Sequence, residues 1–507
     1  MLPSIEDLPA KFPPKLSDSL SDPLFNPQRL TSALILVFLT IHLLLAALIP
    51  LTHYEAHYAL YGTYLDWSYL DHPPLTGWLQ TIPQLFSDHD FLLRLIPIVL
   101  LTASQYLLAR SCERLFPTAH PWLAPITLLI INGAIVTHLG ITMAPEVPLL
   151  FAALLCLHSL LTLQNKDRWQ NWLGLGFALG LAGLSKYTGV TLALSSGLIL
   201  LMNRGFAVLK HPGLYLTMAI TLLMISPVLY WNWQNDWASF QFQLGYQFEE
   251  SDSTWSLASA FEAIAIQIGV YSPLLFIGGL LGSARVMRSG NPGGKALVLM
   301  AWPILLLFFW MSGAGRSSAH WTLISWYLLA PLAALWVSEC WGSRAVRWLA
   351  KGSGSFSAVL LMAFLVIPLP MLEFPDMKHP LGKTMGWEEA AEEGQRLLQT
   401  IEPDPDYEEP TLLVTNWHYA SQLSWYTQGA PVRDLSSDPS QYVRWFGAAD
   451  RWTHGIVILP DNENTISVPN MNCTLLEKTP VEYGESLVGH FSFFYCQAIQ
   501  SGQLTSL

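Results

Sequence analysis

Residues 31–50 read TSALILVFLTIHLLLAALIP, and this stretch decides the class of the fold. It contains no Asp, Glu, Lys or Arg, and a helix of about 20 apolar residues can cross the hydrocarbon core of a bilayer. We therefore predict a transmembrane helix here. Residues 1–30 are rich in Pro, Ser and Asp and lack the basic-then-apolar layout of a signal peptide. We expect them to form a poorly ordered cytoplasmic tail before an uncleaved signal anchor.

Apolar stretches of the same kind recur along the chain to about residue 373. The sequence is 52% hydrophobic and 12% charged, whereas roughly a quarter of the residues in an average soluble protein are charged. These features predict an α-helical polytopic membrane protein with about eleven spans, and ten to thirteen fit the same pattern. The predicted spans are 31–50, 91–110, 122–138, 145–164, 172–185, 190–203, 213–230, 261–284, 296–312, 321–339 and 355–372.

The distribution of Lys and Arg predicts the orientation of the chain. If the N-terminal tail is cytoplasmic, the connections on the opposite side carry almost no basic residues apart from Lys186 and Arg316. This asymmetry follows the positive-inside rule and places the chain in a bacterial inner membrane with a periplasmic C-terminus. The basic residues of the inner connections are Arg110, Arg114, Lys166, Arg168, Arg204, Lys210, Arg285, Arg288, Lys295, Arg344, Arg347 and Lys351.

The sequence divides into a tail (1–30), a transmembrane domain (31–374) with an outer loop at 52–90, and a soluble periplasmic domain (375–507). The last part contains strand-like runs and one helix-like run, which predict a small α/β domain. Its two cysteines, Cys473 and Cys496, either form a disulfide in an oxidising compartment or remain unpaired thiols. The strand-like runs are 411–415, 455–460 and 491–496, and the helix-like run is 417–428.

The formal net charge of −12 argues against nucleic acid as a partner, because a nucleic-acid-binding protein needs a basic stripe to displace counterions. The predicted partners are the lipid bilayer and ligands at its outer face.

The first outer loop is the most unusual part of the sequence. Residues 52–78 read THYEAHYALYGTYLDWSYLDHPPLTGW, without a Lys or Arg. We predict an interfacial helix that breaks at His72-Pro73-Pro74, because proline offers no amide donor and disfavours the helical region before it. The tyrosines also fit an ordinary aromatic belt at headgroup depth. The carboxylates Glu55 and Asp71 are costly near a bilayer and indicate a pairing or a chemical role.

Other outer turns carry further charged and polar residues. Glu146 lies at the start of a predicted span, where capping of a helix N-terminus is the simpler explanation. Lys186 lies where two short spans meet, and snorkelling to the interface is the simpler explanation there. The remaining residues are Trp231 and Asn232 in the loop 226–255 and Arg316 and His320 in the loop 312–321.

Carboxylates and cations gathered on one face indicate chemistry on an anionic and partly apolar substrate. A polyprenyl-phosphate sugar has both properties. Lys186 and Arg316 would hold the donor phosphate and stabilise it as a leaving group, while a carboxylate takes the proton of an attacking hydroxyl.

Six motifs in series resemble the bacterial branch of the dolichyl-phosphate-mannose protein mannosyltransferase-like family, which are GT-C glycosyltransferases and include the lipid A aminoarabinose transferase as a relative. The resemblance covers roughly residues 30–340. It implies inverting, metal-independent or metal-assisted transfer of a monosaccharide from a polyprenyl-phosphate donor to an envelope glycolipid, glycan or protein acceptor. The motifs are EAHY (55–58), LDWSYLDHPPL (65–75), MAPEVPLL (143–150), GLSKYTG (183–189), SPVLYWNWQNDW (226–237) and AHW (319–321).

The resemblance also implies roles for single residues. The family's first-loop Asp-Glu pair falls on Tyr54 and Glu55, so the first acid is missing. A tyrosine with an ordinary pKa near 10 cannot act as a base at neutral pH. We therefore predict Glu55 as the general base, with Asp71 second and Glu146 as an orienting catalytic carboxylate. The residues expected to bind the substrate are Tyr58, His72, Trp231, Asn232 and His320.

A divalent metal held by Asp71, His72 and His320 is a further prediction, and no other cofactor is expected. Two other functions stay open. A flippase or transporter of lipid-linked sugars would also be polytopic, but it predicts charges at the membrane midplane or internal repeats. The loss of the acid at Tyr54 is also compatible with a non-catalytic family member. The identities of the sugar and of the acceptor stay open.

Overall fold

The computed structural model describes residues 26–116, 121–248, 255–315, 318–369, 380–402, 405, 407–427, 429, 432–436, 439–450, 452–460, 464–483 and 486–499. The contacts within the chain form two compact units. The first, called the helical unit, comprises Met1–Leu44, Leu95–Ile141 and Pro145–Ala363. The second, called the loop–sheet unit, comprises Leu45–Arg94, Thr142–Ala144 and Phe364–Leu507.

The predicted multi-pass helical architecture is confirmed. Within the described residues, eight helical segments are long and apolar enough to cross a membrane, or ten if each of two bent pairs is one span. The eight are α2 (Pro27–Leu48), α5 (Asp90–Leu93) with α6 (Leu95–Leu115), α9 (Glu146–Asn165), α11 (Val190–Arg204) with its flanking 3₁₀ turns η3 (Tyr187–Gly189) and η4 (Gly205–Lys210), α12 (Pro212–Gln234), α16 (Pro292–Gly313), η5 (Ala319–Thr322) with α17 (Leu323–Cys340), and α18 (Arg344–Val366).

Three segments separate the count of eight from the predicted eleven. The segment predicted at 172–185 is the helix α10 (Trp169–Ser185), which has 17 residues and is short for a span. The segment predicted at 261–284 is two helices, α14 (Leu257–Tyr271) and α15 (Pro273–Ser289), bent by 108°. The break falls at Ser272, whose φ of 77° lies outside the helical region, directly before the proline that begins α15. The other bent pair is α7 (Leu123–Ile131) with α8 (Ala134–Ile141), at 79°.

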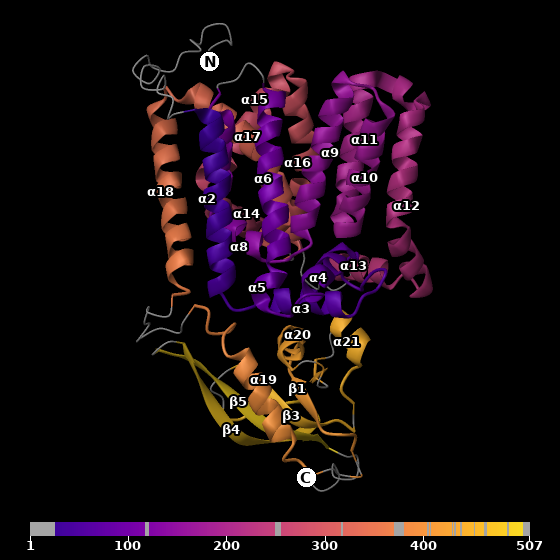
Figure 1. Cartoon of the computed structure of the whole chain (residues 1–507), viewed down its shortest axis with the longest axis vertical. Coiled ribbons are helices and arrows are strands. Elements are labelled where there is room, and N and C mark those ends of the chain that lie inside the picture. The colour runs from indigo at the N-terminus through magenta and orange to yellow at the C-terminus, as the bar shows by residue number, and fades with distance from the viewer. Residues whose placement is uncertain are drawn as a thin grey trace. The chain divides into compact units, whose positions relative to one another are not determined.

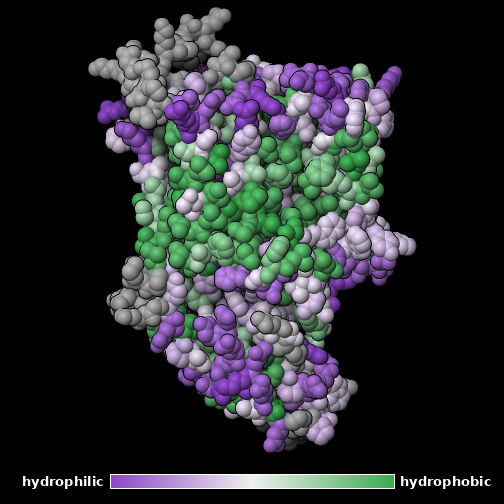
Figure 2. Space-filling view, viewed as in Figure 1, coloured by the Kyte–Doolittle hydropathy of each residue, from purple (hydrophilic) through white to green (hydrophobic). Residues whose placement is uncertain are grey.

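The helical unit has central and peripheral helices. In α9 and α17, 72% of the most apolar window is buried, whereas the share is 17% in α12 and 6% in α18. α9 therefore packs inside the bundle, against α6 and α10, whereas α12 and α18 lie at its periphery (Figure 1). Figure 2 shows hydrophobic residues as a band around these helices, with hydrophilic residues gathered at the bundle end drawn at the top.

The loop–sheet unit begins with the first outer loop. The predicted interfacial helix is α3 (His53–Thr63), and the predicted break at His72-Pro73-Pro74 separates it from α4 (Leu75–Gln84). The break is defined by hydrogen bonds, because the Tyr69 amide donates to the His72 carbonyl at 3.0 Å. Asp71 therefore lies in a closed turn between two helices.

The predicted α/β domain is confirmed as a five-stranded sheet of order β2-β1-β3-β5-β4. β1 pairs in parallel with β2 and β3, and the β3–β5 and β5–β4 pairs are antiparallel. The helices α19 and α20 pack on β1 and enclose a core with Trp387 and Phe493 (Figure 1). The elements are α19 (Trp387–Leu398), β1 (Thr411–Val414), α20 (Trp417–Tyr426), β2 (Val432–Asp434), α21 (Gln441–Phe446), β3 (His454–Leu459), β4 (Met471–Tyr483) and β5 (Ser486–Ala498).

A disulfide joins Cys473 and Cys496, which lie directly opposite each other on β4 and β5. Of the two alternatives that the sequence leaves open, the structure has the paired one. The cross-link fastens the edge strand β4 to the sheet.

Candidate active site

Glu55 lies at the start of α3 and forms a capping box with Thr52. The amide and the hydroxyl of Thr52 both donate to Glu55 Oε2 at 2.9 Å, and the Glu55 amide donates to Thr52 Oγ1 at 3.4 Å. This reciprocal pair satisfies donors that the first turn of a helix would otherwise leave without partners. The capping box explains locally why an acid is needed three residues after Thr52.

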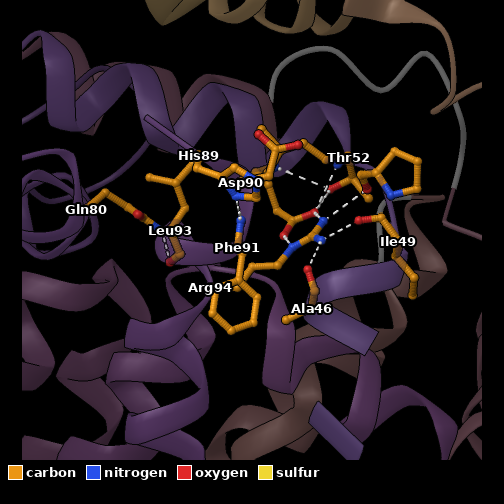
Figure 3. A network of polar contacts seen from close by, with 12 residues as sticks. Ala46, Ile49, Thr52, Gln80, His89, Asp90, Phe91, Leu93 and Arg94 are labelled. Atoms are coloured by element: carbon orange, nitrogen blue, oxygen red, sulfur yellow. Dashed lines mark hydrogen bonds and ion pairs between the residues drawn. The ribbon is translucent and has the colours of Figure 1, made fainter. Parts of the chain in front are cut away.

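Arg94 holds the other side of the Glu55 carboxylate. Its Nε donates to Oε1 at 2.7 Å and its Nη2 donates to Oε2 at 2.9 Å. The same guanidinium donates to the carbonyls of Ala46, Ile49 and Pro50, in and directly after the last turn of α2, and Figure 3 shows Arg94 beside Ala46 and Ile49. Arg94 and Glu55 are 1% and 4% exposed. A bidentate pair of this kind is a strong structural clamp when every donor is satisfied.

The Glu55 carboxylate is therefore buried and engaged on both oxygens, by Arg94 on Oε1 and by Arg94 and Thr52 on Oε2. Burial alone would raise the pKa of Glu55, but the charge and hydrogen bonds of Arg94 and the hydrogen bonds of Thr52 outweigh burial and lower the pKa. This arrangement argues against Glu55 as the general base, and we interpret Glu55 as a residue that fixes α3 to the end of α2. No local pattern pairs it with Arg94, which lies inside the predicted span 91–110.

Asp71 has a different environment. The Tyr61 hydroxyl donates to Oδ1, and His57 Nε2 lies 3.5 Å from Oδ2. The Asp71 side chain is 22% exposed, whereas His57 is 2% exposed. Burial would raise the pKa of Asp71, but the hydrogen bond from His57, the charges of His72 and His57, and the hydrogen bond from Tyr61 together hold it well below its usual range. Asp71 is thus an ionised carboxylate that Tyr61 and His57 orient and that solvent reaches.

Aromatic rings surround this carboxylate. Tyr58 lies beside Tyr61 at 5.4 Å and beside His72 at 5.8 Å between ring centroids. The Tyr69 ring stacks near Tyr61 at 3.7 Å, and its hydroxyl donates to the Tyr61 carbonyl at 2.7 Å. Burial, followed by the charge of Asp71, raises the pKa of Tyr61 well above its ordinary value, so this hydroxyl remains a donor. Predicted substrate-binding residues Tyr58 and His72 lie beside the predicted catalytic residue Asp71.

Tyr54, which replaces the first acid of the family pair, is 40% exposed. Its ring lies 4.4 Å from that of His53, 5.8 Å from that of His418 and 6.3 Å from that of Trp417. Burial, then the charges of His53 and His57, lowers the pKa of His418 to about 4, so that ring is neutral at neutral pH. The position of the missing acid is therefore part of an uncharged aromatic group that includes α20.

In the helical unit, Glu146, Lys186 and His320 lie together. The Lys186 ammonium donates to Glu146 Oε1, and His320 Nε2 lies 3.7 Å from the same oxygen. Lys186 Nζ also lies 5.4 Å from the centroid of the Trp321 ring, a cation–π geometry. Glu146 is 2% exposed, Lys186 13% and His320 29%. Glu146 is the most buried of the three side chains, and Lys186 and His320 are more accessible to solvent.

Local structure fixes Lys186 and His320. Lys186 is the extended residue between α10 and the 3₁₀ turn η3, and Gly189 closes that turn onto α10. A Cβ at Gly189 would lie 2.5 Å from the Ala182 carbonyl oxygen, so only glycine permits this approach. On the other side, Gln267 and Tyr271 donate to the Ala319 carbonyl at 3.3 and 3.2 Å and hold the turn η5 that carries His320.

Trp231 and Asn232 lie in the last turn of α12. Asn232 is fully buried, its Nδ2 donates to the Val228 carbonyl at 3.0 Å, and its Oδ1 accepts the Ser239 amide at 3.2 Å. Its carbonyl also accepts the Trp237 amide, and Trp237 has a positive φ of 60°. Asn232 thus stabilises the turn into α13 (Ala238–Phe248), and Trp231 is 4% exposed. These contacts give both residues a structural role and leave substrate binding by them a prediction.

Arg316, predicted to bind the donor phosphate, lies outside the described residues. In the part of the chain that the structure describes, no three His, Cys, Asp or Glu side chains form a group that could hold a metal ion. A metal held by Asp71, His72 and His320 stays a prediction.

A family model matches part of the chain, in agreement with the predicted resemblance. Residues 71–231 match the family model described as dolichyl-phosphate-mannose-protein mannosyltransferase. No curated protein sequence matches the chain.

Solved structures are similar over most of the chain. The structures of ArnT from Cupriavidus metallidurans, without ligand and bound to undecaprenyl phosphate, each match with a TM-score of 0.61 at 15% identity, covering 92% of this chain and 97% of theirs. The archaeal oligosaccharyltransferase AglB from Archaeoglobus fulgidus, in complex with an inhibitory peptide and a dolichol-phosphate, matches with a TM-score of 0.54 at 11% identity, covering 84% of this chain and 69% of its own. The predicted resemblance and the GT-C fold are confirmed.

Proposed function

We propose that the chain is an inverting glycosyltransferase that moves a monosaccharide from a polyprenyl-phosphate donor to a hydroxyl of an envelope glycolipid, glycan or protein. The observation that carries this proposal is Asp71, an ionised and partly exposed carboxylate in a motif that matches the family, on a GT-C fold. The undecaprenyl phosphate of the similar ArnT structure supports the choice of donor.

In the proposed reaction, the acceptor oxygen attacks the anomeric carbon and the bond from that carbon to the phosphate oxygen breaks. The electron pair of the broken bond stays on the phosphate, which needs no acid because its charge is shared among several oxygens. The proton of the acceptor hydroxyl passes to Asp71 and then to water. Since the pKa of Asp71 is low, the carboxylate acts chiefly by orienting the hydroxyl and takes its proton late in the step.

We assign Glu146, Lys186 and His320, called the Lys186 group, to binding of the leaving phosphate. An ammonium carries three N–H donors, and Glu146 accepts one of them, which fixes the position of the charge. His320 adds a second polar group beside the same carboxylate. A fixed cation at a developing anion lowers the barrier without reorganisation during the reaction. Glu146 thus orients the groups that hold the donor.

The positive-inside asymmetry supports placing the protein in a bacterial inner membrane with the first outer loop and the C-terminus in the periplasm. The lipid bilayer is then both the solvent of the spans and the source of the polyprenyl donor.

The test uses the purified full-length protein, a labelled polyprenyl-phosphate sugar and a membrane lipid extract. Transfer of the label to an acceptor, lost in Asp71→Asn, is the expected result. Movement of the labelled lipid across a vesicle bilayer without transfer would instead identify a flippase. Binding of the donor with neither transfer nor movement would favour a non-catalytic member, for which the loss of the acid at Tyr54 is the motivating observation.

A further inference from the structure

Two short helices of the C-terminal part of the chain contact the first outer loop near Asp71, α20 at α3 and α21 at the turn that carries Asp71. From α20, Ser421 Oγ lies 2.9 Å from His57 Nδ1, and the opposite ring nitrogen of His57 is the one that faces Asp71. From α21, Gln441 Oε1 accepts the amide of Leu70, the residue before Asp71, at 2.7 Å. Ser421 is 0% exposed and Gln441 is 4% exposed, so both contacts are shielded from water.

The tautomer of His57 follows from these partners. Nε2 faces a carboxylate, which can only accept, so Nε2 carries a proton. In a neutral ring, Nδ1 then has the lone pair and accepts the hydroxyl proton of Ser421. The result is a directed chain in which Ser421 donates to His57 and His57 donates to Asp71.

We infer that Ser421 and Gln441 are positioning residues for Asp71, so that the C-terminal sheet domain completes the acceptor-activating part of the site. This inference rests on the proposed function, in which Asp71 receives the acceptor hydroxyl. Ser421 stabilises, through the hydrogen bond to Nδ1, the ring tautomer that presents a donor to Asp71, and Gln441 fixes the backbone one residue before it.

Other contacts of α20 with the first outer loop involve neither Asp71 nor His57. Gln422 Nε2 donates to the Leu51 carbonyl at 2.9 Å, and the Tyr426 hydroxyl donates to Asp90 Oδ2 at 3.0 Å. These contacts hold α20 against the loop by themselves. Loss of the Ser421 hydroxyl should therefore leave the packing in place and change only the chain of donors that ends at Asp71.

The experiment measures kcat and the acceptor KM of full-length variants in the transfer assay, together with thermal unfolding. We expect Ser421→Ala to lower kcat about three- to tenfold, the size of one hydrogen bond, with KM changed less than about twofold. Tyr426→Phe is the matched control, since it deletes a hydroxyl from the same helix and interface. It should lower the unfolding temperature by a similar amount and leave kcat unchanged.

A pair of His57 variants provides a test that does not depend on Ser421. His57→Gln can keep an amide donor near the position of Nε2, whereas His57→Phe keeps a ring without a donor. We expect His57→Phe to lower kcat about 100-fold and His57→Gln to restore most of that loss.

Three results would overturn the inference: equal kcat losses in Ser421→Ala and Tyr426→Phe, wild-type kcat in Ser421→Ala, or equal losses in the two His57 variants. If Ser421→Ala does not fold, the His57 pair decides alone. An inactive Asp71→Asn protein beside fully active Ser421→Ala and His57→Phe proteins would refute the inference and leave the proposed function intact. A fully active Asp71→Asn protein would refute the proposed base itself.

Discussion

The two carboxylates of the first outer loop, Glu55 and Asp71, have opposite environments. Glu55 is 4% exposed and takes charged hydrogen bonds from Arg94, whereas Asp71 is 22% exposed and is oriented by Tyr61 and His57. Both have a lowered pKa, so ionisation alone does not distinguish them. The difference teaches that accessibility to solvent and the kind of partner, rather than charge, separate a structural acid from a chemical one in this loop.

The largest effect is expected at the exposed carboxylate. Asp71→Asn should lower transfer by about 10³-fold, within the range found when a positioned proton acceptor is removed, and should leave the fold intact. The transfer assay with labelled donor measures it. The control is Asp66→Asn, an exposed acid of the same loop, which should retain activity. Equal losses in both variants would show that Asp71 does not differ in function from another acid of the loop.

The buried carboxylate should respond in stability instead. Arg94→Met leaves Glu55 as a buried charge without its guanidinium, which should cost about 3–5 kcal/mol of unfolding free energy. The double variant Glu55→Gln/Arg94→Met should recover part of this loss, because neither charge is then left alone. Thermal unfolding in detergent measures both. A single Arg94→Met variant as stable as the wild type would show that the pair is not a clamp.

Part of the fold and of the candidate site could be predicted from the sequence. The apolar windows predicted the spans, and His72-Pro73-Pro74 predicted the break directly after Asp71, because these signals are local. The pairing of Arg94 with Glu55, 39 residues away, and that of Ser421 with His57, 364 residues away, were not accessible, because nothing in a local pattern specifies a distant partner. The bend at Ser272-Pro273 had a local signal in the proline, which the apolar composition around it concealed.

A third prediction concerns the Lys186 group. Lys186→Met/Glu146→Gln removes both charges of a buried pair, so the protein should fold while its donor KM rises about 10- to 100-fold. Glu146→Gln alone keeps the ammonium and should raise the donor KM less. Titration of the labelled donor checks both, and an unchanged donor KM in the double variant would separate Lys186 from phosphate binding.

The smallest effect is on the pH dependence of stability. The pKa of Glu55 in the folded chain is below its ordinary value of 4.5, so its contribution is present above that pH and is lost as the pH falls toward the folded value. Asp71 contributes with the same sign. Glu55→Gln should therefore lose less stability on acidification than the wild type. Parallel acid profiles for the two proteins would contradict the lowered pKa.

The most direct measurement compares Glu55→Gln and Asp71→Asn in the same transfer assay, with rates expressed per folded molecule. We predict that folded Glu55→Gln transfers sugar at close to the wild-type rate while Asp71→Asn has lost transfer. A Glu55→Gln protein that folds but does not transfer, beside an active Asp71→Asn protein, would contradict this assignment and return the role of the base to Glu55.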